Sequence, residues 1–261
     1  MKKMRLILMV GTLFLLWPAF SWAAFDLFNS EDYSIELEGR YWKPKLSGTI
    51  NISDNGIGSD INPVNDLGFD ERKGFGEGRL QIKFLENNKF NFSYLDLRWT
   101  AGKKLTKTIY FNGLTYPSGT QVDSKMEAKM FKGGYEYDFL VGKYGFLGVT
   151  ADVIFADTFM GLDARALGIS ESSQDDLFFP LVGLNSRLII VKWASLTAKV
   201  SGLPMGGRGY GLDAEASLDI NPIKYFGISF GYRYLKTHLK YRDDKADLTM
   251  DGPFAAVKIR F

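Results

Sequence analysis

Beyond residue 24, apolar and polar side chains alternate along most of the chain with a period of two residues. The stretch IELEGRYW shows the pattern first, with Ile35 and Leu37 on one face and Glu36 and Glu38 on the other. Successive side chains of a β-strand point to opposite faces, whereas an amphipathic helix repeats every 3.6 residues. The alternation therefore predicts β-strands, and helical periodicity is hard to find after residue 24.

We count ten alternating runs, most of them near the roughly ten residues that a tilted strand needs to cross a membrane. In the third run the apolar face shifts by one residue at Leu95, which indicates either a β-bulge or the point where the strand leaves the membrane. The runs cover residues 33–42, 78–84, 90–99, 129–139, 144–155, 179–190, 193–202, 210–220, 225–235 and 255–261.

The connections between these runs alternate in length. Short turns are expected at residues 85–89, 140–144, 191–192 and 221–224, and long loops at 45–74, 161–176, 204–209 and 241–246. Another connection, at residues 103–128, keeps alternating and is expected to form a β-ribbon above the membrane. An even strand number with short turns at one end and long loops at the other is typical of bacterial outer-membrane barrels.

We therefore predict an all-β fold, a closed antiparallel transmembrane barrel of ten strands, with eight or twelve as alternatives. Two aromatic belts support membrane insertion, because such rings gather at both interfaces. A soluble exported sandwich or a lipocalin-like barrel would also alternate and is the alternative. The expected belts are Phe84, Phe90, Phe139, Trp193 and Phe226 near the short turns, and Tyr41, Trp99, Phe155 and Tyr234 near the long loops.

The first residues have the layout of a secretory signal peptide. Lys2, Lys3 and Arg5 precede an apolar stretch, and small residues at Ser21 and Ala23 mark a cleavage site. We predict a signal peptide at residues 1–23 and one barrel domain at residues 24–261. The apolar stretch is shorter than the roughly 20 residues of a spanning helix, so a membrane anchor is the less favoured alternative.

The chain ends AAVKIRF, with alternation up to the last residue. A closed barrel must pair its last strand with its first, because hydrocarbon tolerates no open sheet edge. Val257, Ile259 and Phe261 resemble the C-terminal signature of bacterial outer-membrane barrels. This resemblance implies recognition by the barrel-assembly machinery, handling by periplasmic chaperones and location in the outer membrane. Outer-membrane lipids and lipopolysaccharide are the further partners expected there.

Composition narrows the possible chemistry. Removing Lys2, Lys3 and Arg5 from the 32 basic residues leaves 29 against 30 acidic ones, so nothing suggests nucleic acid as a partner. The chain has no cysteine and one histidine, His238, which excludes thiol chemistry and multi-histidine metal sites. We expect no cofactor and no metal.

The polar faces of the strands are expected to line the lumen. A barrel of eight strands is filled by its own side chains, and open porins have about 16 or more strands, so ten lie near the filled end. We expect these charges to form a structural ion-pair network, and a narrow polar pore or solute site is the alternative. The expected lining residues are Glu36, Glu38, Arg40, Arg79, Lys83, Lys132, Glu136, Asp152, Arg187, Lys199, Asp213, Glu215, Asp219, Arg233, Lys258 and Arg260.

The leading function is therefore a non-enzymatic envelope protein, either structural or a narrow pore. The alternative is a protease or lipid-modifying enzyme at the outer rim, with His238 beside Asp243 or Asp244 as the candidate catalytic residues. A third possibility is adhesion or ligand binding by the long loops. The first loop also holds carboxylates that suit Ca²⁺, although their spacing matches no calcium loop and is equally typical of turns: Asp54, Asp60, Asp66, Asp70 and Glu71.

Overall fold

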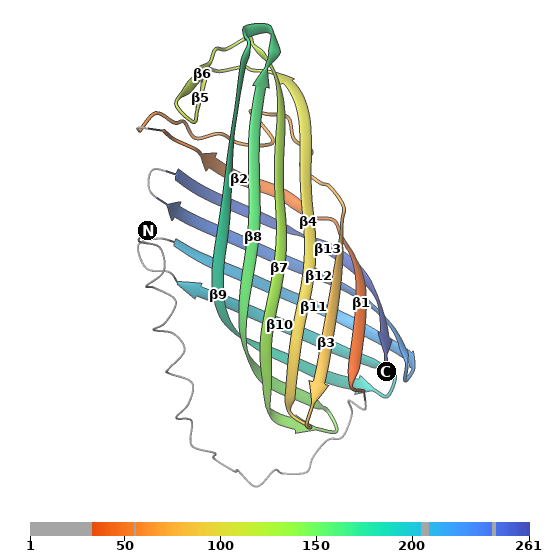
Figure 1. The fold of residues 1–261 in the computed structure, drawn as a ribbon. Helices are drawn as coiled ribbons and strands as arrows, with labels where there is room; N and C mark the ends of the chain where they lie inside the picture. Colours follow the sequence, from red (N-terminus) through yellow and green to blue (C-terminus); the bar gives the residue numbers. More distant parts are fainter. Residues whose placement is uncertain (1–32, 55, 205–208, 242–243) are drawn as a thin grey trace.

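The structure, a computed structural model, describes residues 33–54, 56–204, 209–241 and 244–261, so the predicted signal peptide lies outside the described residues. Strands dominate, and they wind into one tall barrel (Figure 1). Among the described residues, no helix has the length and apolar character needed to cross a membrane. The elements are β1 (Ile35–Trp42), β2 (Lys45–Asn51), β3 (Phe75–Phe84), β4 (Asn88–Lys104), β5 (Ile109–Phe111), β6 (Leu114–Tyr116), β7 (Gln121–Gly142), β8 (Gly145–Ala164), the 3₁₀ turn η1 (Arg165–Leu167), β9 (Ile169–Val191), β10 (Ala194–Pro204), β11 (Gly209–Ile223), β12 (Phe226–Tyr241) and β13 (Asp244–Arg260).

The barrel is closed by antiparallel pairing of its first and last strands. Neighbours follow the order β1, β3, β4, β7, β8, β9, β10, β11, β12, β13, and β13 pairs back with β1 and β2. At the bottom of this seam, Glu36 lies opposite Arg260, and the amide of Phe261 donates to the Ile35 carbonyl at 2.9 Å. The regular C-terminal end is thus part of the closure.

Segments β1 and β2 form one barrel strand with an interruption at residues 43–44. Trp42 lies opposite Phe254 and Lys45 opposite Asp251, so the register against β13 continues without a shift. Pro44 has no N–H to donate toward the other neighbour, and the pairing with β3 ends at Trp42. Counted in this way the barrel has ten strands, which confirms the predicted fold class.

One side of the barrel stands higher than the other (Figure 1). Strands β7, β8 and β9 have 22, 20 and 23 residues, and with β4 they rise to the hairpin of β5 and β6. The predicted long loop at residues 161–176 is wrong, because β8 and β9 continue through it and meet at η1. Above the membrane both faces of a strand can be polar, so the period-two signal fades there.

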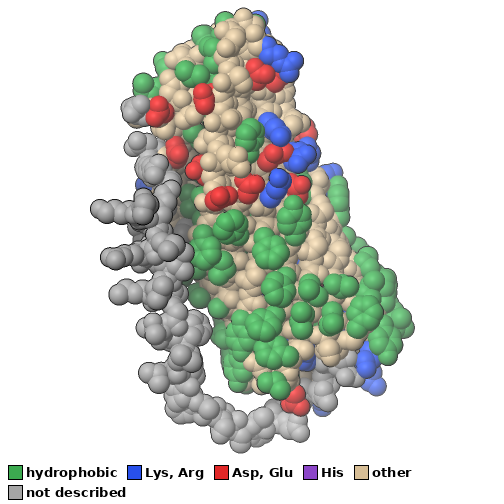
Figure 2. Space-filling view, viewed as in Figure 1, with side chains coloured by type: hydrophobic (Ala, Val, Ile, Leu, Met, Phe, Trp, Pro, Cys, Tyr) green, Lys and Arg blue, Asp and Glu red, His purple; other side chains and the backbone are tan. Residues whose placement is uncertain are grey.

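The outer wall carries an apolar band in its lower part, with charged side chains above it (Figure 2). Leu37, Phe131 and Ile259 are exposed on this band by 45%, 51% and 46%. Trp99 does not belong to an outer belt, because it is only 2% exposed and points into the barrel. The register between β4 and β7 has no shift at Leu95, so the change of apolar face there marks the strand leaving the membrane and not a bulge.

Candidate functional site

The interior of the barrel has two zones, a charged zone in the lower part and an apolar zone above it. The residues expected to line the lumen all lie at inward-facing strand positions, and each is buried or half-buried. They converge from opposite walls because the lumen of a ten-stranded barrel is narrow enough for long side chains to meet. We call the ion-paired residues of the lower zone the lumen network: Glu36, Glu38, Arg40, Glu77, Arg79, Lys132, Asp152, Arg187, Lys199, Asp213, Glu215, Asp219, Arg233, Lys258 and Arg260.

Glu215 on β11 is the central acceptor of the network. Arg79 on β3 donates to both of its carboxylate oxygens, at 2.8 Å and 2.9 Å. Arg40 on β1 adds a third contact, from Nη1 to Oε2 at 2.8 Å. Because β11 lies nearly opposite β3 in the strand order, these bonds cross the lumen. Bidentate arginine–carboxylate pairs are both strong and geometrically specific.

A second bidentate pair lies beside the first. Arg233 on β12 donates through Nε and Nη2 to the two oxygens of Asp213, each at 2.9 Å. Its third nitrogen, Nη1, reaches Glu77 on β3 at 3.2 Å. Glu77 also accepts from Arg79 at 2.9 Å, so it joins the two pairs into one network.

Lysines extend the network toward β8 and β10. Lys132 on β7 lies 3.2 Å from Asp213 and 3.4 Å from Asp152, measured from Nζ to Oδ2. Lys199 on β10 approaches the same Asp152 oxygen at 3.4 Å. The acidic side of β11 thus faces cations from β1, β3, β7 and β12, while Lys199 extends the network to Asp152 of β8.

The lowest part of the network surrounds Asp219. Lys258 on β13 contacts its Oδ1 at 2.8 Å, and the hydroxyls of Thr197 and Ser229 donate to the same carboxylate. Below it, Arg260 contacts Glu36 at 2.5 Å, from Nε to Oε2. The C-terminal strand therefore supplies both structural closure and cations for the lumen.

A separate buried cluster occupies the wall of β4, β7 and β9. Lys89 is 0% exposed and lies 2.8 Å from Asp138 and 3.3 Å from Glu136. The amide of Asn185 donates to both Glu136 oxygens at 2.9 Å. The Lys89 ammonium also lies 3.4 Å from the centre of the Phe146 ring, a favourable cation–π distance.

Glu77 and Lys89 are important residues that the sequence analysis missed. Glu77 directly precedes the predicted run at residues 78–84, and Lys89 lies in the predicted turn at residues 85–89. Counting back in steps of two from Arg79 and from Asn91 places both on the inward face. The alternation therefore extends beyond the predicted runs, and β3 and β4 begin before them, at Phe75 and Asn88.

The upper zone is an apolar core that fills the barrel and continues into the cap. We call it the apolar plug. Inward-facing strand residues pack with residues from the long loops, and the Phe75 and Trp99 rings meet edge to face at 4.7 Å. Its members are Trp42, Leu46, Ile50, Ile61, Leu67, Phe69, Phe75, Leu95, Leu97, Trp99, Leu105, Ile109, Phe111, Tyr116, Val122, Met126, Met160, Leu162, Ala164, Leu235, Met250 and Phe254.

The two zones meet through cation–π contacts. The Arg40 guanidinium lies 3.7 Å from the centre of the Phe254 ring, and the Arg233 guanidinium lies 5.0 Å from that of Trp42. Guanidinium groups stack well on aromatic faces, so the charged zone reaches the apolar plug without a layer of unpaired cations.

The β5–β6 hairpin is held to the barrel by Tyr116. Its ring is 0% exposed, and its hydroxyl donates to the Leu162 carbonyl of β8 at 3.2 Å. Burial raises the pKa of the Tyr116 phenol to about 12, and the nearby carboxylates of Glu171 and Asp163 add to the shift. The predicted ribbon is real for β4 and β7, but its tip is a separate two-stranded sheet.

The two candidate catalytic residues that the structure describes, His238 and Asp244, have different partners. His238 is on the outer face of β12, where its Nδ1 lies 2.9 Å from Asp247 and its ring stacks on Tyr210. Asp244 accepts instead from the backbone amide of Ser53, at 2.8 Å. Asp243 lies outside the described residues. The imidazole therefore faces away from the barrel interior and beside a different carboxylate from the expected one.

The acids of the first loop are used in separate local contacts. Asp66 pairs with Lys107 at 2.8 Å, and Glu71 pairs with Lys45 at 3.0 Å. Within the described residues, no group of three or more His, Cys, Asp or Glu could hold a metal ion. The loop arrangement thus offers nothing that favours the calcium alternative.

Comparison with known proteins supports the fold. The structure is similar to the outer membrane protease OmpT of Escherichia coli, with a TM-score of 0.54, 9% sequence identity, and coverage of 87% of this chain and 97% of that chain. Ail, the attachment invasion locus protein of Yersinia pestis, gives a TM-score of 0.39 with 12% identity over 87% of this chain and 99% of that one. The toluene transporter TodX of Pseudomonas putida gives 0.37 with 7% identity over 89% and 90%.

The sequence matches no family model, and the search of curated proteins finds no match. At 9% identity the likeness to OmpT concerns the fold alone. The chain is a closed antiparallel ten-stranded barrel of the outer-membrane type, as the alternation and the C-terminal resemblance predicted. This fold suggests the bacterial outer membrane as its location.

Proposed function

We propose that the protein is a non-enzymatic, structural barrel of the bacterial outer membrane, exported by its signal peptide, whose interior is closed to solutes. The observation that carries the proposal is the set of ion pairs that cross the lumen, above all Glu215 held by Arg79 and Arg40. A solute would have to displace charge-assisted bonds that are already made. A buried charge that loses its partner is strongly destabilising, by about 3–5 kcal/mol when the partner is removed by mutation, so a passing solute that separated these pairs would meet a large barrier.

The apolar plug adds a second barrier above the lumen network. Trp42 and Trp99 are 0% and 2% exposed within it, and residues from two long loops complete the packing. Ions do not pass through a packed apolar region, because their dehydration there is very costly. Of the two expected roles, a narrow pore and a structural barrel, the second is the better supported.

Single-channel conductance tests the proposal. The chain from residue 24 onward is refolded, checked for the heat-dependent gel mobility of a folded barrel, and placed in a planar bilayer. We expect no steady conductance from the wild-type barrel. Steady conductance whose ion preference changes in Asp213→Asn with Glu215→Gln, but not in the surface control Glu71→Gln, would overturn the proposal and establish a selective pore.

Enzymatic activity is the alternative, since OmpT is a protease by name. The candidate general base that the sequence offers for such an activity is His238, which is the only histidine of the chain. We expect the purified wild-type barrel and His238→Ala to show the same background hydrolysis of peptide and lipid substrates as a protein-free control. Activity that is present in the wild type and lost in this variant would refute the non-enzymatic proposal.

A further inference from the structure

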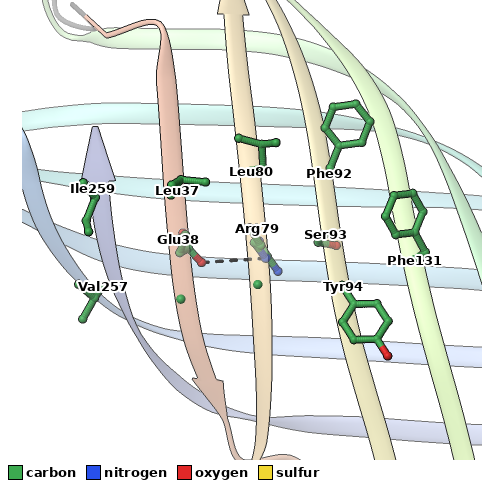
Figure 3. Close-up of a pocket in the computed structure, with 12 residues that line it drawn as sticks. Leu37, Glu38, Arg79, Leu80, Phe92, Ser93, Tyr94, Phe131, Val257 and Ile259 are labelled. Carbon is green, nitrogen blue, oxygen red and sulfur yellow. Dashed lines mark ion pairs between the residues drawn. The ribbon is translucent and has the colours of Figure 1, made fainter. Parts of the chain in front are cut away.

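A groove crosses the outer wall at the closing seam of the barrel (Figure 3). It has a volume of about 600 Å³, within the roughly 300–1,000 Å³ that is usual for small-molecule sites. Its rim is apolar, with Leu37 and Val257 on one side of the bare centre and Tyr94 and Phe131 on the other. These side chains face the membrane, since each is exposed by 45–51%.

Two adjacent glycines form the floor of the groove. Gly39 on β1 lies directly opposite Gly78 on β3, between Val257 of β13 and Tyr94 of β4. A Cβ built on either glycine meets nothing within 4 Å. Neither glycine has the positive φ that would require this residue. Neither backbone geometry nor crowding therefore requires glycine at these positions. The missing side chains leave the empty space that forms the groove.

Cations lie above the groove on the same part of the wall. Lys43 is exposed on the outer face, four positions above Gly39. Lys45 and Arg72 face each other across the next rung, and Lys45 pairs with Glu71 at 3.0 Å. Among the described residues, no carboxylate lies within ion-pair distance of Lys43 or Arg72. Two cations are thus available to a ligand.

We propose that this surface binds one lipopolysaccharide molecule of the outer leaflet, with an acyl chain in the groove and a phosphate on Lys43 and Arg72. Four residues of strand span about 13 Å along the strand, or about 10 Å along the membrane normal at the usual tilt of about 40°, which is within the roughly 15 Å hydrocarbon thickness of one leaflet. The groove is therefore at acyl-chain depth when the cations are at headgroup depth. The long loops mark this end of the barrel as the outer one.

The charge above the groove favours a lipid over a second copy of the chain. A twofold dimer across the seam would bring Lys43 and Arg72 of one protomer toward those of the other, because such an interface uses the same surface twice. Like charges facing each other oppose association. An anionic headgroup is instead attracted by both cations, and a single acyl chain matches a groove with a narrow glycine floor.

The test measures lipid A retained by the purified barrel. Wild type and variants are refolded into phosphatidylcholine nanodiscs that contain lipid A, extracted in mild detergent, and examined by native mass spectrometry. Gly39→Val with Gly78→Val fills the groove, and Lys43→Gln with Arg72→Gln removes the cations. Valine suits exposed strand positions, so the first variant should fold.

Matched controls place the same changes elsewhere on the wall. Ala216→Leu adds bulk at an exposed outer position of β11, and Lys236→Gln removes an outer cation of β12. We expect one lipid A per wild-type barrel and unchanged retention in both controls. Retention of lipid A should be about 30-fold lower in the cation variant, since each interfacial cation contributes roughly fivefold to the affinity. Retention should be about tenfold lower in the groove variant, because the valine side chains exclude acyl-chain methylenes from the groove.

Three results would overturn the proposal. The first is equal retention in all variants, and the second is equal competition by phosphatidylglycerol, which would mean that any anionic lipid suffices. The third is a dimer that Gly39→Val with Gly78→Val abolishes, because the groove would then be a protein interface. None of these depends on conductance, so failure of this proposal and failure of the closed-barrel proposal are distinguishable.

Discussion

Glu215→Gln is the change that most directly tests the lumen network. The carboxylate accepts three hydrogen bonds from two arginines, at 2.8, 2.8 and 2.9 Å. Glutamine keeps the shape but removes the negative charge and places an NH₂ group against a guanidinium. Arg40 and Arg79 would then share a buried region with only Glu38 and Glu77 to balance them.

The size of the effect follows from the burial of the Arg79 and Glu215 side chains. Removing one partner of a fully buried ion pair costs about 3–5 kcal/mol. The Arg79 and Glu215 side chains are 22% and 14% exposed, so water can partly replace the lost bonds. We therefore expect the low end, a decrease of about 3 kcal/mol in the free energy of unfolding.

The assay is reversible urea unfolding in lipid vesicles, followed by tryptophan fluorescence. Glu71→Gln is the matched control, because it makes the same chemical change to a side chain that is 52% exposed and pairs with Lys45. An exposed pair contributes about 0–1 kcal/mol. A loss of unfolding free energy in Glu215→Gln that is no larger than in Glu71→Gln would refute the reasoning. It would mean that the lumen contains enough water to solvate each charge without its ion-pair partner.

Three further predictions concern the cap and the C-terminus. Because the pKa of Tyr116 is raised from 10.0 to about 12, the folded state keeps a proton that the unfolded chain loses. The stabilisation from this proton is complete below pH 10 and falls by up to roughly 3 kcal/mol as the pH rises to 12. Between pH 9 and pH 11, the free energy of unfolding should therefore decrease less in Tyr116→Phe than in wild type. Trp99→Ala should lower stability by about 3–5 kcal/mol through the cavity it leaves, and a loss under about 1 kcal/mol in urea unfolding would mean that the apolar plug is loosely packed. Deleting Phe261 removes three backbone hydrogen bonds to Ser34 and Ile35, which should cost about 1–3 kcal/mol in vesicles, while assembly in cells should fall much further if the resemblance of the last residues to an assembly signal is functional.

The alternation of the sequence predicts the strands well wherever the chain meets lipid on one side and charge on the other. In β1 the buried residues Glu36, Glu38 and Arg40 alternate with exposed Leu37 and Tyr41, and the sequence pattern is the same. The two-residue period determines which residues share a face of the strand. A strong contrast between a polar face and an apolar face identifies the segment as a strand.

The same signal does not tell inside from outside where the interior changes character. Leu97 and Trp99 are apolar, as lipid-facing residues are, yet both point into the barrel because the apolar plug begins there. The partners of Glu215 could not be predicted either, since Arg79 is 136 residues away in sequence and meets it only across the closed lumen. Pairing across a barrel depends on strand order and stagger, which the alternation does not contain.

The seam between β1 and β13 has a consequence for how the chain reaches its final state. Glu36 and Arg260 meet across 224 residues. Bringing such distant segments together costs about 5 kcal/mol of chain entropy by the logarithmic scaling of loop closure, against roughly 1 kcal/mol for a short hairpin. Every neighbouring hairpin is able to form before this step, so the seam is expected to close last. Until it does, the first and last strands each present an open edge, and contacts of such long range fold slowly. While these two edges are unpaired, the chain presents two open templates for pairing with other strands, so this is the stage of folding at which it is most exposed to misassembly.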